Sequence, residues 1–314
     1  MKEPLIVIAG PTASGKSDLA VALARRINGE IISADSMQVY RSMDIGTAKI
    51  TLEEMMGVPH YLLDVADPME EFDVARYKEL ADAARKEILE RGHIPILCGG
   101  TGFYIQAVTR DISFGEQDPD LNLRESLRAL AEDKGNEALH EELKAVDPEA
   151  AAEIHPNNVK RVIRALEYYS VTGKKISEHN REEKEKESPY EVLFFQITDN
   201  RQTLYERIDR RVDFMMEEGL ADEVRYLRAM GLTRQHVSMQ GLGYKEMLDH
   251  LDGRTTLEEA VYILKRDTRH YAKRQETWFN REKDTVKINT SSFDHNISSI
   301  VSFMEQTAHE RGII

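Results

Sequence analysis

A glycine-rich stretch near the start of the chain constrains the fold more than any other feature. Residues 10–17 read GPTASGKS, which matches the pattern of Gly, four residues, Gly-Lys and then Ser or Thr. An apolar run at residues 5–9 precedes the stretch, and apolar residues recur at helical spacing from 17 to 27. This order of strand, loop and helix predicts a phosphate-binding loop, because its backbone N–H groups and the helix N-terminus attract anions.

Further short apolar runs predict a parallel sheet. Residues 30–33, 95–98 and 192–197 have the composition of buried strands, and 285–289 is typical of a short last strand. Apolar residues at helical spacing cover about 74–90, between the runs at 30–33 and 95–98. Strand and helix therefore alternate, which predicts an α/β fold with crossover helices.

The middle of the chain has a different texture. From about residue 114 to 187 no convincing strand is found, only helical pieces separated by turn residues such as Asp147-Pro148 and Thr172-Gly173. We therefore predict a helical insertion domain at residues 114–189, within a core formed by residues 1–113 and 190–314.

Composition and charge exclude several classes of protein. A single cysteine, Cys98, rules out a disulfide framework and any multi-cysteine metal site. No apolar run approaches the roughly 18 residues of a membrane helix, so we expect no membrane association and a cytoplasmic location. The net charge of −14 argues against a polyanionic partner, but residues 264–283 hold seven Lys and Arg against three acids, a local charge of +4.

An acid at the carboxyl end of a strand is the second candidate feature. A kinase or NTPase with this loop also needs a metal-holding Asp after a nearby strand, yet Cys98 is followed by GGTG at residues 99–102. Asp35 follows the second strand instead, at the edge where doubly wound sheets bind ligands. The sequence leaves open whether Asp35 holds a metal, acts as a base or caps a turn.

Eight motifs in the same order resemble those of the bacterial tRNA isopentenyltransferases, also called tRNA dimethylallyltransferases. The resemblance covers about residues 5 to 282. The motifs are residues 10–17, DSMQVY at 35–40, MDIGTAK at 43–49, GGTG at 99–102, KRVIRALE at 160–167, RIDRR at 207–211, MQGLGY at 239–244 and AKRQETWF at 272–279.

The resemblance implies a fold and an activity. The fold is α/β, with a P-loop kinase-like parallel sheet core and a helical insertion domain that contacts tRNA. The activity is transfer of a dimethylallyl group from dimethylallyl diphosphate to N6 of adenosine 37, beside the anticodon, in tRNAs that read codons beginning with U. The donor diphosphate would occupy the loop, with Mg²⁺ as cofactor and the tRNA anticodon loop as partner. A monomer is expected.

The resemblance also implies the roles of individual residues at the donor site. Asp35 is the base for N6, while Thr12, Lys16 and Thr101 complete the catalytic set, Thr12 at the bridging region of the diphosphate and Thr101 in the channel where donor and base meet. Ser17 offers its hydroxyl to Mg²⁺. The diphosphate-binding set is Gly10, Pro11, Thr12, Ala13, Ser14, Gly15, Lys16, Ser17, and Arg207 or Arg211.

A second set is expected to contact tRNA. It joins residues around Asp35 to two basic helices, because RNA loops are recognised through splayed bases, aromatic stacking and phosphate contacts. The set is Asp35, Ser36, Met37, Gln38, Thr101, Arg124, Lys160, Arg161, Val162, Ile163, Arg164, Gln240, Gly241, Lys273, Arg274 and Arg281.

Three other functions compete with this interpretation. A small-molecule P-loop kinase would have no use for the basic segment that contains Trp278. An adenylate isopentenyltransferase would use the same donor but a free nucleotide acceptor. A regulatory tRNA- or nucleotide-binding protein would gain little from Asp35, whose charge repels a diphosphate.

Overall fold

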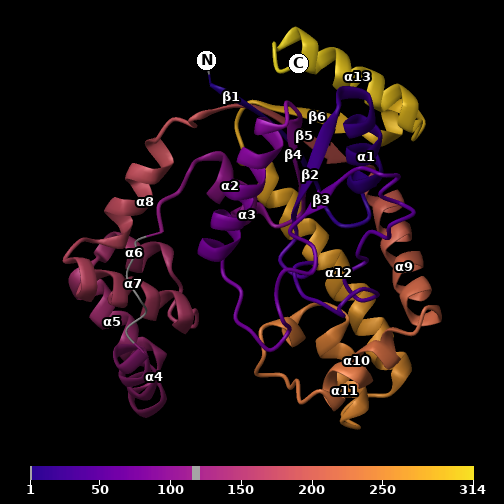
Figure 1. Ribbon diagram of the computed structural model, residues 1–314. Helices are drawn as coiled ribbons and strands as arrows, with labels where there is room; N and C mark the ends of the chain where they lie inside the picture. The colour runs from indigo at the N-terminus through magenta and orange to yellow at the C-terminus, as the bar shows by residue number, and fades with distance from the viewer. Residues whose placement is uncertain (1, 115–120) are drawn as a thin grey trace. The chain divides into compact units, whose positions relative to one another are not determined.

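The structure, a computed structural model, describes residues 2–114 and 121–314. It divides into two compact units, and a parallel sheet forms the centre of the larger one. Its six strands lie in the order β3-β2-β4-β1-β5-β6, and every neighbouring pair is parallel (Figure 1). All five predicted strands are present, which confirms the α/β fold, whereas the two-residue β3 was not predicted. The strands are β1 (Glu3–Ala9), β2 (Gly29–Ala34), β3 (His60–Tyr61), β4 (Ile94–Gly99), β5 (Tyr190–Thr198) and β6 (Thr285–Asn289).

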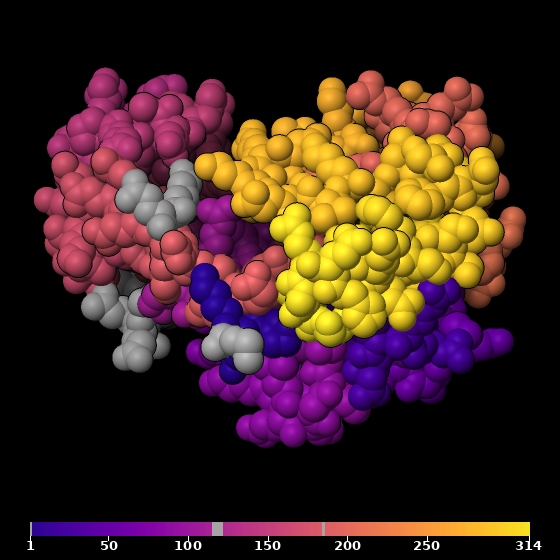
Figure 2. All heavy atoms as spheres, turned by 90° about the horizontal axis from the view of Figure 1, so that it is seen from above, coloured from indigo at the N-terminus to yellow at the C-terminus, as the bar shows by residue number. Residues whose placement is uncertain are grey.

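Both faces of the sheet are covered, which explains why its strands are continuously apolar. In β1, Leu5 and Val7 pack into one core and Ile6 and Ile8 into the other. Helices α2 (Val74–Glu90), α3 (Gly102–Thr109) and α12 (Leu257–Phe279) contribute to the first core. Helices α1 (Lys16–Ile27) and α13 (Ile297–Glu310) contribute to the second, and they pack against each other (Figures 1 and 2).

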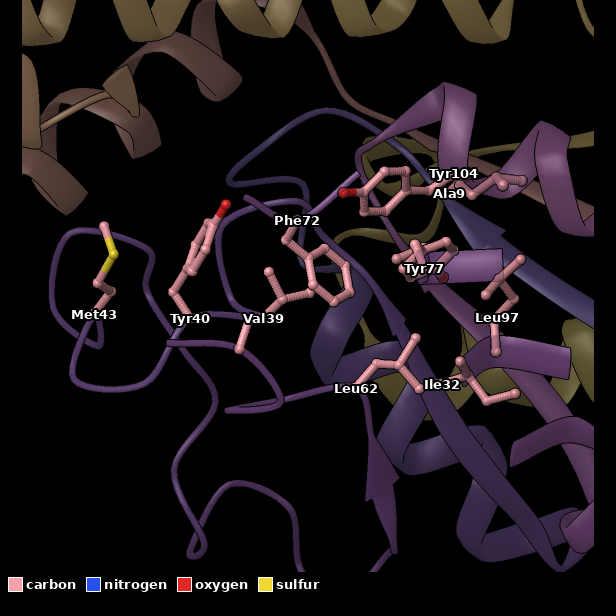
Figure 3. Close-up of a cluster of buried hydrophobic side chains, with 14 of the residues drawn as sticks. Ala9, Ile32, Val39, Tyr40, Met43, Leu62, Phe72, Tyr77, Leu97 and Tyr104 are labelled. Atoms are coloured by element: carbon pink, nitrogen blue, oxygen red, sulfur yellow. The ribbon is translucent and has the colours of Figure 1, made fainter. Parts of the chain in front are cut away.

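Aromatic side chains stiffen the first core beside the carboxyl end of β2. The rings of Tyr77 and Tyr104 stack with their centroids 3.9 Å apart, and the Tyr77 hydroxyl donates to the Ser33 carbonyl at 3.0 Å. Tyr40 meets the edge of Phe72, with ring centroids 6.5 Å apart (Figure 3). Stacked and edge-to-face rings stabilise a core beyond their buried area. The Tyr77 contacts therefore tie α2 and α3 to the carboxyl end of β2.

Between the last two strands the larger unit is helical, as predicted. The elements are α9 (Arg201–Glu217), α10 (Leu220–Ala229), a 3₁₀ turn η1 (Ser238–Gln240), α11 (Tyr244–Leu251) and, after β6, a 3₁₀ turn η2 (Thr290–Phe293). None of the helices that the structure describes is long and apolar enough to cross a membrane.

The smaller unit spans Ile112–Glu187, and the larger one joins Met1–Asp111 to Ser188–Ile314. These bounds lie within two residues of the predicted insertion at 114–189. The smaller unit has its own core, to which Leu127, Leu139 and Val162 belong. Its helices are α4 (Leu121–Lys134), α5 (Asn136–Val146), α6 (Pro148–Glu153), α7 (Val159–Thr172) and α8 (Ile176–Glu185).

Candidate active site

The phosphate-loop sequence adopts the conformation that its glycines predict. It connects β1 to α1, and Gly15, with a φ of +83°, is the N-cap residue directly before the helix. A side chain on Gly10 would place its Cβ 2.5 Å from the Ile197 carbonyl oxygen. The Ser14 hydroxyl is buried and makes no hydrogen bond to the described residues. An unpartnered buried hydroxyl inside a ring of backbone amides fits an oxyanion ligand.

Two cations face this loop in an environment that disfavours their charge. Burial lowers the pKa of Lys16, with Cys98 raising it and Arg211 lowering it further. Burial also lowers the pKa of Arg211. The Lys16 ammonium donates only to the Pro11 carbonyl, at 3.3 Å, among the described residues. A bound dianion would compensate both buried charges.

A pocket of about 510 Å³ opens beside the loop, and both predicted arginines of α9 line it. Arg207 is already paired there: it lies 3.1 Å from Asp199 Oδ2 and donates to His295 Nδ1 at 3.0 Å. For Arg211 no ion pair or hydrogen bond is found within the part of the chain described. The sequence left open which arginine serves the diphosphate, and the structure brings both to the loop.

Asp35 and Thr101 meet at the carboxyl edge of β2 and β4. Oδ1 of Asp35 accepts from the amides of Met37 at 2.8 Å and Gln38 at 3.3 Å. The Thr101 hydroxyl accepts from the Ser36 amide at 3.0 Å. Asp35 therefore does cap a turn, but only through one oxygen. Its Oδ2 has no hydrogen bond to any residue that the structure describes. The negative charge of Asp35 acts to raise the pKa of Lys16, against the larger effect of burial.

The segment after Asp35 is anchored by its own polar side chains. The Gln38 amide donates to the carbonyls of Thr47 and Ala48, both at 3.2 Å. Met37 lies against Gly241, where an added Cβ would come within 2.5 Å of the Met37 methyl carbon. Gln240 is exposed. The predicted tRNA residues of this region are thus adjacent, and Gln38 also holds the turn at residues 47–48.

Helix α12 contributes side chains for which no role was predicted. Gln275 contacts the phosphate loop, and the Tyr271 hydroxyl lies beside the side chains of Thr101 and Gln275. Burial raises the pKa of Tyr271, and Asp35 raises it further. Trp278 packs on Gly102 and lies, partly buried, against the first core. Residues 271, 275 and 278 share one helix face, so polar side chains on an apolar face were the available signal.

Exposed basic side chains gather near the C-terminal end of α12. Lys273 and Arg274 on the helix and Arg281, two residues beyond its end, are exposed, and the Arg274 guanidinium lies 5.6 Å from the centre of the Tyr271 ring. An accessible cation is what a phosphate contact needs.

The predicted tRNA residues of the smaller unit fall into two groups. Lys160, Arg161 and Arg164 are exposed on α7. Val162 and Ile163 are buried, with exposed fractions of 0% and 5%, so their predicted contact with tRNA is corrected to a packing role in the core of this unit. Because an amphipathic helix buries every third or fourth residue, an unbroken motif on it cannot face one ligand.

Arg124 has a structural partner in the smaller unit. Its guanidinium binds the buried Glu167 carboxylate through two bonds, from Nε at 2.7 Å and from the terminal amine at 2.9 Å. Such a two-point pair satisfies the carboxylate and fixes the guanidinium plane. Its predicted contact with tRNA stays a prediction.

Known proteins resemble this chain over nearly its whole length. The profile of a family described as IPP transferase matches residues 38–282. A tRNA dimethylallyltransferase of Lachnoclostridium phytofermentans is 54% identical over 312 residues, which cover 99% of each chain. One from Halalkalibacterium halodurans is 50% identical over 313 residues, again covering 99% of each.

Solved structures give the same result. The tRNA isopentenylpyrophosphate transferase of Bacillus halodurans has a TM-score of 0.74 and 48% identity, covering 99% of this chain and 98% of that one. A eukaryotic dimethylallyltransferase acting on tRNA has a TM-score of 0.85 and 31% identity, covering 99% and 80%. With relatives at least half identical along its full length and a profile that spans most of it, this chain belongs to the IPP transferase family.

Proposed function

We propose that the chain transfers a dimethylallyl group from dimethylallyl diphosphate to N6 of adenosine 37, beside the anticodon, in tRNAs that read codons beginning with U. One observation carries the proposal: the phosphate loop follows β1 and Asp35 follows β2, so both stand at the carboxyl edge of the same parallel sheet, on either side of the end of β4. Relatives named tRNA dimethylallyltransferase at 54% and 50% identity support the class of reaction. We place the reaction in the cytoplasm and assign it to a monomer.

The chemistry follows from the two sides of this site. N6 attacks C1 of the dimethylallyl group, the bond between C1 and the diphosphate oxygen breaks, and the diphosphate leaves with the electron pair. The free oxygen of Asp35 takes the proton that N6 loses. Lys16, Arg211 and the loop amides stabilise the charge that develops on the leaving diphosphate. Adenosine 37 must leave its stack to reach Asp35.

The residues of the loop also fit a magnesium ion bound together with the diphosphate. Ser17 lies in the first turn of α1, its side chain is exposed, and no hydrogen bond of its hydroxyl is found in the described ranges. In the same ranges no cluster of three or more His, Cys, Asp or Glu side chains could hold a metal. Mg²⁺ retains water and binds phosphate oxygens readily, so one hydroxyl suffices from this chain. The ion would supply positive charge to the departing diphosphate.

The acceptor separates this proposal from its alternatives. Labelled dimethylallyl diphosphate is incubated with Mg²⁺ and the chain, with unmodified tRNA, AMP or ATP as acceptor in parallel. We expect label in tRNA alone, at adenosine 37. Label in a free nucleotide would instead make the chain an adenylate isopentenyltransferase. Label in no tube, with phosphate transferred from ATP, would make it a kinase.

The exposed lysine Lys273 on α12 supports tRNA as the partner and gives a second prediction. Lys273 is exposed and forms no ion pair within the described residues, so we assign it to an RNA phosphate. Lys273→Ala is expected to weaken all tRNA substrates about equally and to reduce the slope of log affinity against log salt by about 0.7 to 1. The measurement is tRNA affinity between about 50 and 200 mM salt.

Lys265 is the matched control for that prediction. It lies on the same helix, but its ammonium is 2.6 Å from the Asp213 carboxylate. Lys265→Ala is expected to leave the salt slope unchanged, because Lys265 pairs with Asp213 and makes no contact with an RNA phosphate. A Lys273→Ala effect confined to one tRNA would contradict the phosphate assignment.

A further inference from the structure

The side-chain amide of Gln275 joins two segments of the site that are distant in the sequence. Oε1 accepts from the Thr12 amide at 2.9 Å, and Nε2 donates to the Gly100 carbonyl, also at 2.9 Å. The side chain is buried, with an exposed fraction of 5%. Both functional groups of the amide are therefore used, and each is satisfied away from water, where a hydrogen bond is expensive to lose.

The two segments belong to the two substrates of the proposed reaction. Thr12 lies in the loop for the donor diphosphate, and its hydroxyl is the group expected at the bridging region of that diphosphate. Gly100 directly precedes Thr101, which is hydrogen-bonded to Ser36 next to the base Asp35. We infer that Gln275 is a positioning residue. It holds the phosphate loop at residues 10–17 and the sheet edge that carries Asp35 and Thr101 in the relative position that transfer requires. This inference rests on the proposed function.

Backbone packing around Gln275 shows that the site is built for this amide. A Cβ on Gly100 would lie 2.2 Å from Gln275 Nε2, so only glycine leaves the space that the amide fills. The Thr12 amide is occupied by Oε1, so it is not available to the diphosphate. The neighbouring Tyr271 hydroxyl lies beside both Gln275 and Thr101. One face of α12 thus contacts both halves of the site.

The two hydrogen bonds of the Gln275 amide, to Thr12 and Gly100, form a clamp between the two segments. Losing this clamp is expected to affect transfer more than folding. A displacement of about 1 Å far from the reacting atoms can cost a rate about 10²-fold when two substrates must be aligned. Methionine has a similar length and volume to glutamine but forms neither hydrogen bond. Gln275→Met therefore removes the clamp and keeps the packing, whereas Gln275→Ala also opens space next to Gly100.

The first experiment compares Gln275→Met with Leu264→Ala, a buried residue of the same helix in the first core. Steady-state kinetics give kcat and the KM for dimethylallyl diphosphate, and calorimetry gives the affinity for inorganic pyrophosphate. For Gln275→Met we expect kcat/KM to fall about 10- to 100-fold and pyrophosphate to bind several times more weakly. For Leu264→Ala we expect a lower melting temperature, with the KM for dimethylallyl diphosphate and the affinity for pyrophosphate unchanged.

The second experiment is a double-mutant cycle with Gly100→Ala. Its added methyl group collides with the Gln275 amide, so Gly100→Ala alone should reproduce the kinetic defect of Gln275→Met. In a Gln275→Ala background the same methyl group has space, so Gly100→Ala should add little. Strong non-additivity supports the clamp. Two defects that simply add, or normal kinetics and pyrophosphate affinity in Gln275→Met, would overturn it.

The pyrophosphate measurement separates this inference from the proposed function. If the chain transfers no dimethylallyl group, the proposed function fails, yet weaker pyrophosphate binding by Gln275→Met still shows that the amide positions the loop. If transfer occurs and Gln275→Met matches the native chain in both measurements, only the inference fails.

Discussion

An Asp35→Asn variant is expected to transfer the dimethylallyl group about 10²-fold more slowly, or worse, while its affinity for tRNA stays within about twofold of the native value. The rate falls because loss of a general base typically costs a reaction about 10²- to 10⁴-fold. The measurement is single-turnover transfer to saturating tRNA, beside a direct tRNA binding assay. Wild-type transfer by this variant would remove Asp35 from the chemistry.

The choice of asparagine follows from the geometry of the turn. One oxygen of Asp35 accepts from the amides of Met37 and Gln38, and asparagine caps such amides about as well as aspartate does. Asp35→Asn therefore removes the charge and keeps the turn. Asp35→Ala removes both, and is expected to cost a further 0.5–2 kcal/mol of stability, about the value of a lost cap. A defect in alanine but not in asparagine would make Asp35 a structural residue.

The strands were predictable because a parallel sheet buried on both faces demands unbroken apolar runs. Strand β3 lacks that signal: its two residues pair with β2 only after the chain has folded back. Helix α13 was not predicted, although Ile300, Met304 and Ala308 recur at helical spacing and pack against α1. Its signal was present in the sequence, but no motif drew attention to it.

Asp35 was a candidate from its position alone, because it directly follows β2 at the edge where parallel sheets bind ligands. Thr101, two residues after β4, was proposed only through the resemblance, and the structure brings it to Ser36 beside Asp35. Gln275 could not be assigned in this way, because its partners lie 263 and 175 residues away in the sequence. Val162 and Ile163 show the opposite error, since a motif taken as one surface lies on a helix that buries them.

A Lys16→Met variant is expected to lose about 10²- to 10³-fold in kcat/KM for dimethylallyl diphosphate, the usual scale for removing one group that stabilises developing charge. In free energy this is about 3–4 kcal/mol. Lys16 faces the diphosphate loop with a desolvated ammonium, so no solvent cation can replace it at short range. The tRNA affinity is expected to stay unchanged, and a variant with native kcat/KM would exclude Lys16 from the donor site.

The pH dependence of the native chain tests the same assignment without a structural change. Because burial lowers the pKa of Lys16 below the usual 10.5, the free protein loses this charge at a lower pH than an exposed lysine does. Donor binding needs the charged form, so kcat/KM is expected to fall as pH rises through that lowered pKa. Bound diphosphate favours the ammonium, which shifts the corresponding fall in kcat to higher pH. Lys16→Arg keeps its charge throughout this range, so the alkaline fall should disappear even if the bulkier side chain lowers the rate. An unchanged fall in Lys16→Arg would assign the titration to another group.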